Sequence, residues 1–346
     1  MKLLIAADSF KGSCSSLEVA QYVGEGIHSV CPDAEVLSVG IADGGEGTME
    51  TLTQALHGTF ITCPAHDALM RPIQSRYGWL ETEHLAILDM AETGGLTRIA
   101  PLERRPMDAT TYGLGEQIAH ALQHGARRIL IGLGGSATTD GGVGMVRGME
   151  NGEMRMENAE CIALCDVKNP LFGPEGAAYV FALQKGATPE QVALLDQRLR
   201  RLADSSAHPE LAWVPGAGAA GGLGFAILNN LGGTLQPGID TILDIQHFDD
   251  LLTGVDLVIT GEGKIDAQTL MNKAPLGVLR RAQKHHIPCI AIAGRVEDRE
   301  RLIAGGFADI LCINPEGVPT EQAMQPEYCR GRLGEIGKMC KLCYLR

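Results

Sequence analysis

The stretch Leu130-Ile131-Gly132-Leu133-Gly134-Gly135-Ser136-Ala137-Thr138-Thr139-Asp140-Gly141-Gly142 is the starting point for interpreting this chain. An apolar run typical of a buried strand gives way to paired glycines, then to hydroxyls and one carboxylate. In a parallel sheet, such a turn carries ligand-binding groups at the carboxyl end of a strand. We therefore predict a phosphate-handling loop, although the same residues taken alone also fit a tight turn between a core strand and a helix.

The strand that enters this loop is one of six with a common pattern. Each is a short aliphatic run whose last residues are polar or glycine-rich, and the six cover 3–9, 35–45, 128–136, 256–263, 288–294 and 308–314. Between them lie segments with the apolar spacing of helices, at 16–30, 48–56, 114–124, 274–285 and 299–303. Alternating strands and helices predict a parallel sheet with helices on both faces, and ligands then gather beyond the carboxyl ends of the strands.

Two blocks interrupt this alternation, residues 60–106 with two neighbouring antiparallel strands and residues 147–238 with a strand, a polar helix and a glycine-rich run. We therefore predict an α/β protein of two domains. The first is a parallel, Rossmann-like, three-layer domain made of residues 1–59, 107–146 and 239–346. The second is a mixed-sheet α/β domain, inserted discontinuously as residues 60–106 and 147–238. We expect the active site in the cleft between them.

The composition is that of a soluble globular protein, with 346 residues, 45% hydrophobic and 21% charged. A formal net charge of −13 argues against a nucleic-acid or anionic-membrane surface, so an anionic ligand needs locally placed cations, amides or metal. No apolar run approaches the ~20 residues of a membrane span, and we expect no signal peptide, because the apolar run 1–7 is too short for one. We expect a cytoplasmic protein with reduced thiols, and Cys340 and Cys343 have no partner pair that would predict zinc.

Three turns on the predicted sheet edge carry acids. Asp8-Ser9-Phe10-Lys11-Gly12 follows the first strand, Asp43-Gly44-Gly45-Glu46-Gly47-Thr48 follows the second, and Thr260-Gly261-Glu262-Gly263-Lys264-Ile265-Asp266 follows a later one, with Lys273 beyond it. Glycine lets backbone amides approach an anion while the acids coordinate Mg²⁺ or accept a proton. Helix caps and solvated turns explain each motif singly. Neither a P-loop nor a dinucleotide-binding fingerprint is present.

The inserted blocks contribute polar candidates. Asp166 and Asn169 have groups that hydrogen-bond a small polyhydroxy acid, Lys185 suits an anion, and Arg71 suits a carboxylate. A turn, a helix start and solvated strand residues are the alternatives for these positions. The scattered histidines predict neither a zinc site nor a Ser/His triad. Carboxylates, lysines and glycine amides together favour phosphoryl transfer, in which positioning and charge neutralisation dominate.

Taken together, these motifs resemble the type 1 glycerate kinases of bacteria over most of the chain. The resemblance rests on Ala7–Gly12, Asp43–Thr48, Gly134–Gly142, Cys165–Leu171, Gln184–Thr188, Pro215–Gly222 and Thr260–Asp266, in the same order and spacing. It implies ATP-dependent phosphorylation of D-glycerate, at the 2-hydroxyl to give 2-phosphoglycerate and ADP, with Mg²⁺. The segment from Arg147 to Glu160 departs from the family, where a longer and unrelated segment stands.

The resulting hypothesis assigns groups of residues to roles. Metal binding or acceptance of the hydroxyl proton falls to Asp43, Glu46 and Asp266, with Asp43 and Asp266 as metal ligands, and charge neutralisation to Lys11 and Lys273. Phosphate oxygens are assigned to Gly44, Gly45, Gly134, Gly135, Ser136, Thr138, Gly261, Glu262 and Gly263. The substrate is assigned to Asp8, Ser9, Arg71, Asp166, Asn169 and Lys185, whereas Asp140 is interpreted as a helix cap.

Two alternatives belong to other functional classes. A non-catalytic nucleotide or metabolite binder of the same fold would be stabilised by ATP without turning it over. A nicotinamide-dependent oxidoreductase is suggested only by the alternating strands and glycines, and the acid-rich turns argue against it. We expect a monomer or small homo-oligomer with small-molecule partners only.

Overall fold

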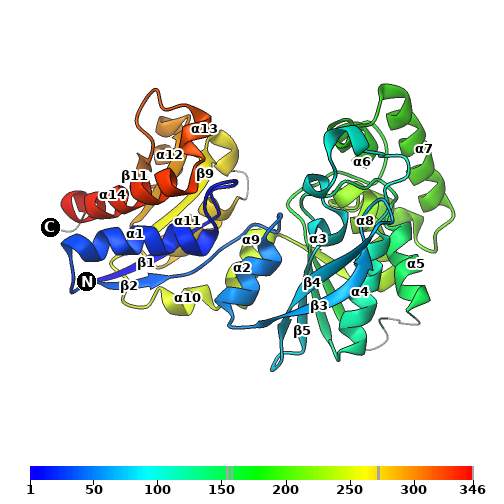
Figure 1. The fold of residues 1–346 in the computed structure, drawn as a ribbon, viewed down its shortest axis with the longest axis horizontal. Coiled ribbons are helices and arrows are strands. Elements are labelled where there is room, and N and C mark those ends of the chain that lie inside the picture. Colours follow the sequence, from blue (N-terminus) through cyan, green and yellow to red (C-terminus); the bar gives the residue numbers. More distant parts are fainter. Residues whose placement is uncertain (153–155, 157–158, 271–272, 345–346) are drawn as a thin grey trace. The chain divides into compact units, whose positions relative to one another are not determined.

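The structure is a computed structural model that describes residues 1–152, 156, 159–270 and 273–344. The chain forms two compact units, unit 1 from Met1–Asp43 with Ile239–Arg346 and unit 2 from Gly44–Gly238. Each unit is built on one sheet (Figure 1). None of the helices in these described ranges combines the length and apolar character needed to cross a bilayer.

Unit 1 is a parallel α/β unit. Within the described ranges its strands are β1 (Lys2–Ala7), β2 (Glu35–Ser38), β9 (Leu257–Ile265), β10 (Cys289–Val296) and β11 (Asp309–Cys312). They lie in the order β11-β10-β9-β1-β2, all parallel, with Leu3 paired to both Val36 and Leu257. Its helices are α1 (Ser16–Val30), α9 (Gly238–Ile245), α10 (Phe248–Leu251), α11 (Ala274–Lys284), α12 (Arg299–Ala304), α13 (Thr320–Ala323) and α14 (Pro326–Tyr344).

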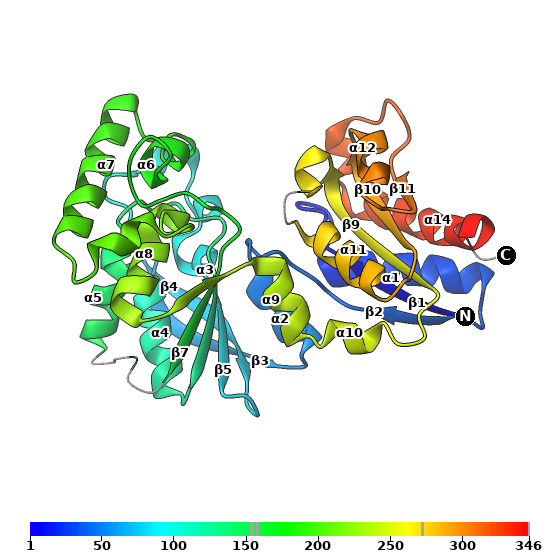
Figure 2. The ribbon, with the colours of Figure 1, turned by 180° about the vertical axis from the view of Figure 1, so that it is seen from behind.

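Helices cover both faces of this sheet because side chains of a strand alternate between faces. Leu3 and Ile5 of β1 pack with α1 and α14, whereas Leu4 and Ala6 pack with α9, α10 and α11. Figure 1 shows α1 and α14 side by side on the first face, and Figure 2 shows α11 on the second. The prediction of a three-layer parallel domain is therefore confirmed for unit 1.

Unit 2 is built on a mixed sheet in the order β3-β4-β5-β6-β7-β8. Its strands are β3 (Thr59–His66), β4 (Pro72–Leu80), β5 (Leu85–Asp89), β6 (Arg128–Gly132), β7 (Glu160–Leu164) and β8 (Thr234–Gln236). The β3–β4 and β4–β5 pairs are antiparallel, and the others are parallel. Its helices are α2 (Thr48–Ala55), α3 (Met90–Gly94), α4 (Tyr112–Gln123), α5 (Val143–Asn151), α6 (Ala177–Phe181), α7 (Pro189–Asp204) and α8 (Ala219–Leu231).

The predicted domain boundaries need correction. Residues 107–146 were assigned to the first domain, but β6 pairs with β5 and β7, so this segment belongs to unit 2. Residues 44–59 also lie in unit 2, which is one continuous segment, and unit 1 is the discontinuous one. The reason is physical: an apolar strand pattern shows that a strand is buried, but it does not show which sheet the strand joins.

The departure from the family pattern lies partly outside the described residues. Of the segment from Arg147 to Glu160, residues 153–155 and 157–158 are not described. Its first residues continue α5 through Asn151, and Glu160 begins β7. The boundary between the units also falls inside a predicted motif, between Asp43 and Gly44.

Candidate active site

Unit 1 contains a pocket of ≈ 1140 Å³ at the carboxyl ends of β1, β9 and β10. Predicted site residues contribute strongly to its lining, which includes Asp8, Ser9, Lys11, Asp43, Glu262, Gly263 and Lys273. Three separate stretches of sequence thus converge because their strands are neighbours in the order β9-β1-β2. Ligands of open parallel sheets bind at this edge, so the pocket is the first candidate site.

Asp8 is the most perturbed carboxylate of this pocket. Its side chain follows β1, is 9% exposed, and accepts a hydrogen bond of 2.6 Å from the Ser9 backbone N–H. Burial, and after it the negative charge of Asp43, raise the pKa of Asp8 from 3.8 to about 7, although the Ser9 N–H and Lys11 oppose this shift. Such a group changes charge near neutral pH, as a proton acceptor at an active site does.

Glu262 and Lys273 form an ion pair on the pocket wall. The Lys273 ammonium lies 3.2 Å from one carboxylate oxygen of Glu262, and the Thr269 hydroxyl donates to the other at 2.7 Å. Burial raises the pKa of Glu262, although Thr269 and Lys273 oppose the shift. Since Lys273 directly precedes α11, the pair fixes a positive charge beside the first turn of this helix.

In unit 2, two glycine turns pack against each other. The Gly134 N–H donates to the Gly44 carbonyl at 3.2 Å, and a Cβ on Gly134 would lie 2.5 Å from the Gly45 Cα. Gly44 and Gly135 have φ values of +88° and +73°, a region that favours glycine. The turn after β6 and the turn before α2 therefore pack backbone against backbone, with no room for a side chain at Gly134.

The hydroxyls of this turn are paired with each other. Ser136 Oγ and Thr138 Oγ1 lie 2.9 Å apart, and the Thr138 N–H donates to Ser136 Oγ at 3.1 Å. The buried Lys185 ammonium donates to the Thr138 carbonyl at 2.5 Å. Burial lowers the pKa of Lys185 to about 8, against the raising effect of Asp140. Lys185 thus fixes the backbone of this turn through the Thr138 carbonyl.

The sequence is similar to known proteins along most of its length. A profile described as the glycerate kinase family matches residues 3–152 and 148–329. The chain belongs to the glycerate kinase family. Glycerate kinase from Bacillus subtilis (strain 168) is 38% identical over 99% of this chain and 98% of its own length. Glycerate 2-kinase from Escherichia coli (strain K12) is 38% identical over 86% of each chain.

A solved structure supports the same assignment. A crystal structure from Salmonella typhimurium LT2, which carries the provisional name glycerate kinase 2, is 35% identical. It matches with a TM-score of 0.85 over 99% of this chain and 97% of its own. The predicted family, the two-unit α/β fold and the prediction of a kinase are confirmed. As a member of a kinase family, the protein uses ATP as a substrate.

Family membership does not establish the roles of the individual predicted site residues. In the structure, several of them have local partners. Asp266 lies 3.0 Å from the Lys264 ammonium, so its charge is already compensated, and it does not line the described part of the unit 1 pocket. Glu46 belongs to unit 2, where it accepts a hydrogen bond of 2.9 Å from Thr97. Within unit 1, Asp8 rather than Asp266 therefore shares a pocket with Asp43.

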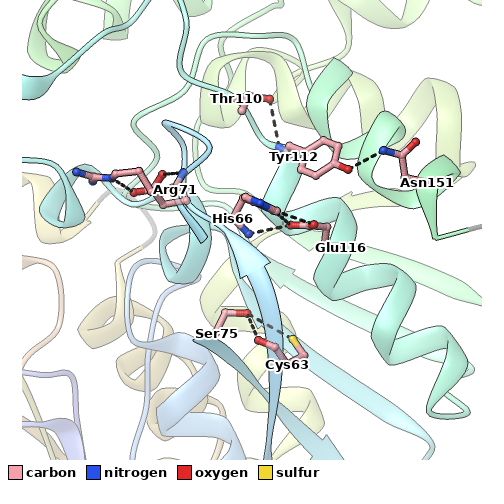
Figure 3. A network of polar contacts seen from close by, with 9 residues as sticks. Cys63, His66, Arg71, Ser75, Thr110, Tyr112, Glu116 and Asn151 are labelled. Carbon is pink, nitrogen blue, oxygen red and sulfur yellow. Dashed lines mark hydrogen bonds and ion pairs between the residues drawn. The ribbon is translucent and has the colours of Figure 1, made fainter. Parts of the chain in front are cut away.

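The predicted substrate residues of unit 2 also have structural partners. Asp166 accepts a hydrogen bond of 2.9 Å from the Gly238 N–H, and the Asn169 amide donates to the Glu175 carbonyl at 2.8 Å. Arg71 forms ion pairs with Asp67 at 2.5 Å and Glu103 at 3.2 Å. Figure 3 shows Arg71 in its local contacts, near the separate pair of His66 with Glu116. Contact of these residues with substrate stays a prediction.

The interpretation of Asp140 as a helix cap agrees with the structure. Its carboxylate accepts hydrogen bonds of 3.1 Å from the N–H groups of Gly142 and Gly144, at the start of α5. It also accepts from the Thr111 N–H and hydroxyl, at 2.8 and 2.9 Å. These bonds tie the start of α5 to the segment before α4 and occupy the carboxylate.

Asp89 is a structurally important acid that the sequence analysis missed. It ends β5, is buried, and accepts hydrogen bonds from the N–H groups of Gly47 at 2.9 Å and Met49 at 3.1 Å. It therefore satisfies backbone donors at the start of α2, next to the Gly44–Gly47 turn. The detectable signal was an acid at the end of an apolar strand.

Asp89 should make stability depend on pH. Burial raises its pKa from 3.8 to about 7, outweighing the lowering effect of the two N–H donors. Between these values the folded protein binds a proton that the unfolded chain has released, so the free energy of unfolding should fall as pH rises from about 4 to about 7. Asp89→Asn should remove this part of the slope in urea unfolding measured at several pH values.

The matched control is Asp108→Asn, which removes an exposed carboxylate from the same unit. The control should keep the wild-type pH slope, because it leaves Asp89 in place. Asp8 also contributes to the pH dependence, but its contribution is the same in the wild type and both variants and cancels when their slopes are compared. An unchanged slope in Asp89→Asn would contradict the assignment of this titration to Asp89.

Proposed function

We propose that this protein transfers the γ-phosphoryl group of ATP to the 2-hydroxyl of D-glycerate, with Mg²⁺, giving 2-phosphoglycerate and ADP. Family membership supports the kinase activity, and the name of the Escherichia coli relative, glycerate 2-kinase, supports the 2-position. The observation that carries the proposal is the pocket of unit 1, in which Asp8, Asp43 and Lys11 converge beside the Glu262–Lys273 pair.

The chemistry of the pocket matches a phosphoryl transfer. Asp8 accepts the hydroxyl proton, since its pKa of about 7 suits proton transfer at neutral pH. Lys11 and Lys273 neutralise negative charge on the transferring group, and Glu262 orients Lys273 through their ion pair. The turn carrying Gly134 and Gly135 belongs to unit 2, and its contact with phosphate oxygens is part of the proposal.

The donor set also fits magnesium. Among the described residues no group of three or more acids, histidines or cysteines is arranged to hold a metal. Mg²⁺ usually takes only one or two protein carboxylates and completes its shell with water and substrate phosphates. Burial and, after it, repulsion from Asp43 raise the pKa of Asp8, so a cation beside Asp43 would relieve part of this effect. When bound, the metal supplies charge neutralisation for the phosphates, and Asp43 would hold it.

Product identification tests the proposed function. Incubation with ATP, Mg²⁺ and D-glycerate should release ADP and give a phosphorus NMR doublet, because the phosphate at the 2-position couples to the single proton on C2. Transfer to the 3-hydroxyl would give a triplet instead. Folded protein that releases no ADP with D-glycerate would contradict the proposal, and L-glycerate serves as the stereochemical control.

Asp43→Asn should weaken the response to magnesium specifically. Removing a ligand carboxylate should raise the Mg²⁺ concentration needed for half-maximal activity by about 10- to 100-fold. The measurement is a Mg²⁺ titration of the rate at saturating ATP and D-glycerate. Asp256→Asn provides a comparison, since this carboxylate accepts the Lys2 N–H at 2.8 Å and lies outside the pocket lining. An equal shift in both variants would exclude Asp43 as the ligand.

A further inference from the structure

A second pocket, of ≈ 480 Å³, lies in unit 2 and shares no residue with the first. It is formed by residues of α5 and α7, by the segment Pro106–Ala109 and by the residues that follow the Ser136–Thr138 turn. Three arginines line it: Arg147 from α5, and Arg198 and Arg201 from α7. The last two are three residues apart and therefore share a helix face. Nothing in the proposed reaction uses this pocket.

Among the residues that the structure describes, the three guanidinium groups have no acidic partners, which is unusual in a chain of net charge −13. Arg198 donates to the Met107 carbonyl at 2.9 Å, and Arg201 makes one long contact of 3.5 Å with the Gln197 side chain. Within the described part of the chain, neither they nor Arg147 forms an ion pair with a carboxylate. Arg281 shows the contrast, because it pairs with both Asp244 and Asp249.

A buried hydroxyl on the same pocket also lacks a partner. Thr139 lines the pocket, is 3% exposed, and its Oγ1 has no hydrogen-bond partner in the described structure. Buried polar atoms without partners are rare, and a bound ligand is one explanation for them. Asp140, the one acid among the described lining residues, already accepts hydrogen bonds from the N–H groups of Gly142 and Gly144 and from Thr111.

We propose that this pocket is a binding site for a small anion that carries a phosphate group, either inorganic phosphate or a phosphate monoester. Guanidinium groups pair well with phosphate oxygens, and the charge of a phosphate dianion complements clustered arginines better than a single carboxylate does. Thr139, whose buried hydroxyl has no partner in the described structure, lies in the wall of the same pocket. Since Thr139 directly follows Thr138, whose carbonyl Lys185 holds, the occupant binds next to the glycine turn.

The test measures anion affinity in a charge-matched pair of variants. Arg147→Gln/Arg201→Gln removes two pocket charges and leaves Arg198 on the Met107 carbonyl. Arg127→Gln/Arg128→Gln removes two exposed charges of unit 2 outside the pocket, where Arg128 faces Glu160 at 3.4 Å. Calorimetric titrations use inorganic phosphate, 3-phosphoglycerate and D-glycerate separately, and near-ultraviolet circular dichroism verifies the fold.

The expected result is that the pocket variant loses at least about tenfold in affinity for a phosphate-bearing anion, whereas the control pair keeps the wild-type value. Phosphate and 3-phosphoglycerate titrations distinguish a free phosphate from a monoester as the preferred occupant. Equal affinity in wild type and pocket variant would overturn the proposal, as would an equal loss in the control pair. Arginine-dependent binding of D-glycerate as tight as that of phosphate would also overturn it. Because binding is measured directly, the result does not depend on kinase activity.

Discussion

Replacing Asp8 by asparagine is expected to lower kcat by about 10²- to 10⁴-fold, the range typical of a lost general base. Asparagine keeps the size of the side chain but neither accepts a proton nor carries charge. The same variant should be at least as stable as the wild type. Burial and Asp43 both disfavour ionised Asp8, so its removal relieves an unfavourable charge. Steady-state rates of ADP release and thermal unfolding would measure the two effects.

The opposite signs of these two effects make the test specific. A purely structural residue that is 9% exposed would lose stability together with activity when changed. Asp33→Asn, which alters an exposed acid of unit 1, should change neither quantity. A kcat close to the wild-type value in Asp8→Asn would exclude Asp8 as the proton acceptor, and another group would then have to accept the hydroxyl proton.

The second large effect is expected at Gly134, where alanine should destabilise unit 2 by about 2 to 3 kcal/mol through overpacking. Its Cβ would lie 2.5 Å from the Gly45 Cα, and backbone atoms cannot move aside as a flexible side chain does. The two glycine turns must separate to admit the methyl group. Because misplacement by about 1 Å can lower rates about 10²-fold, we also expect kcat/KM to fall by that order.

Gly232→Ala separates this clash from the general effect of losing a glycine. Gly232 caps α8 with φ +61°, and nothing lies within 4 Å of its missing Cβ. Alanine there should lower the free energy of unfolding by only about 1 kcal/mol, from left-handed backbone strain, with activity unchanged. Urea unfolding and steady-state kinetics measure both variants. If Gly134→Ala lowered the free energy of unfolding no more than Gly232→Ala, the predicted clash between the two glycine turns would be wrong.

Local patterns predicted the elements well. The helix expected at 16–30 is α1 (Ser16–Val30), because its apolar spacing and the Ser15 capping box are written in neighbouring residues. The convergence of Asp8, Asp43 and Glu262 was also predictable, because β1, β2 and β9 are parallel strands whose carboxyl ends lie at the same edge of one sheet. The bounds of a helix and the acids that follow a strand are both encoded by residues that are neighbours in sequence.

Long-range pairing was not predictable from the same patterns. The strand Arg128–Gly132 is as apolar as β1, yet it joins the other sheet, because its partners β5 and β7 are selected by packing. Consequently the Gly134 turn was placed on the wrong sheet edge. Asp89 was missed for a related reason: its partners, Gly47 and Met49, are about 40 residues away in sequence, and no local spacing reveals them.

The position of β1 in its sheet has a consequence for how the chain is made. β1 is a central strand, and on one side it pairs with β9, with Leu3 opposite Leu257. A ribosome therefore synthesises β3 to β8, the described strands of unit 2, before the residues of β9 exist. Throughout that time one edge of β1 has no native partner, so β1 must stay free of aggregation long after its own synthesis, until β9 has been made.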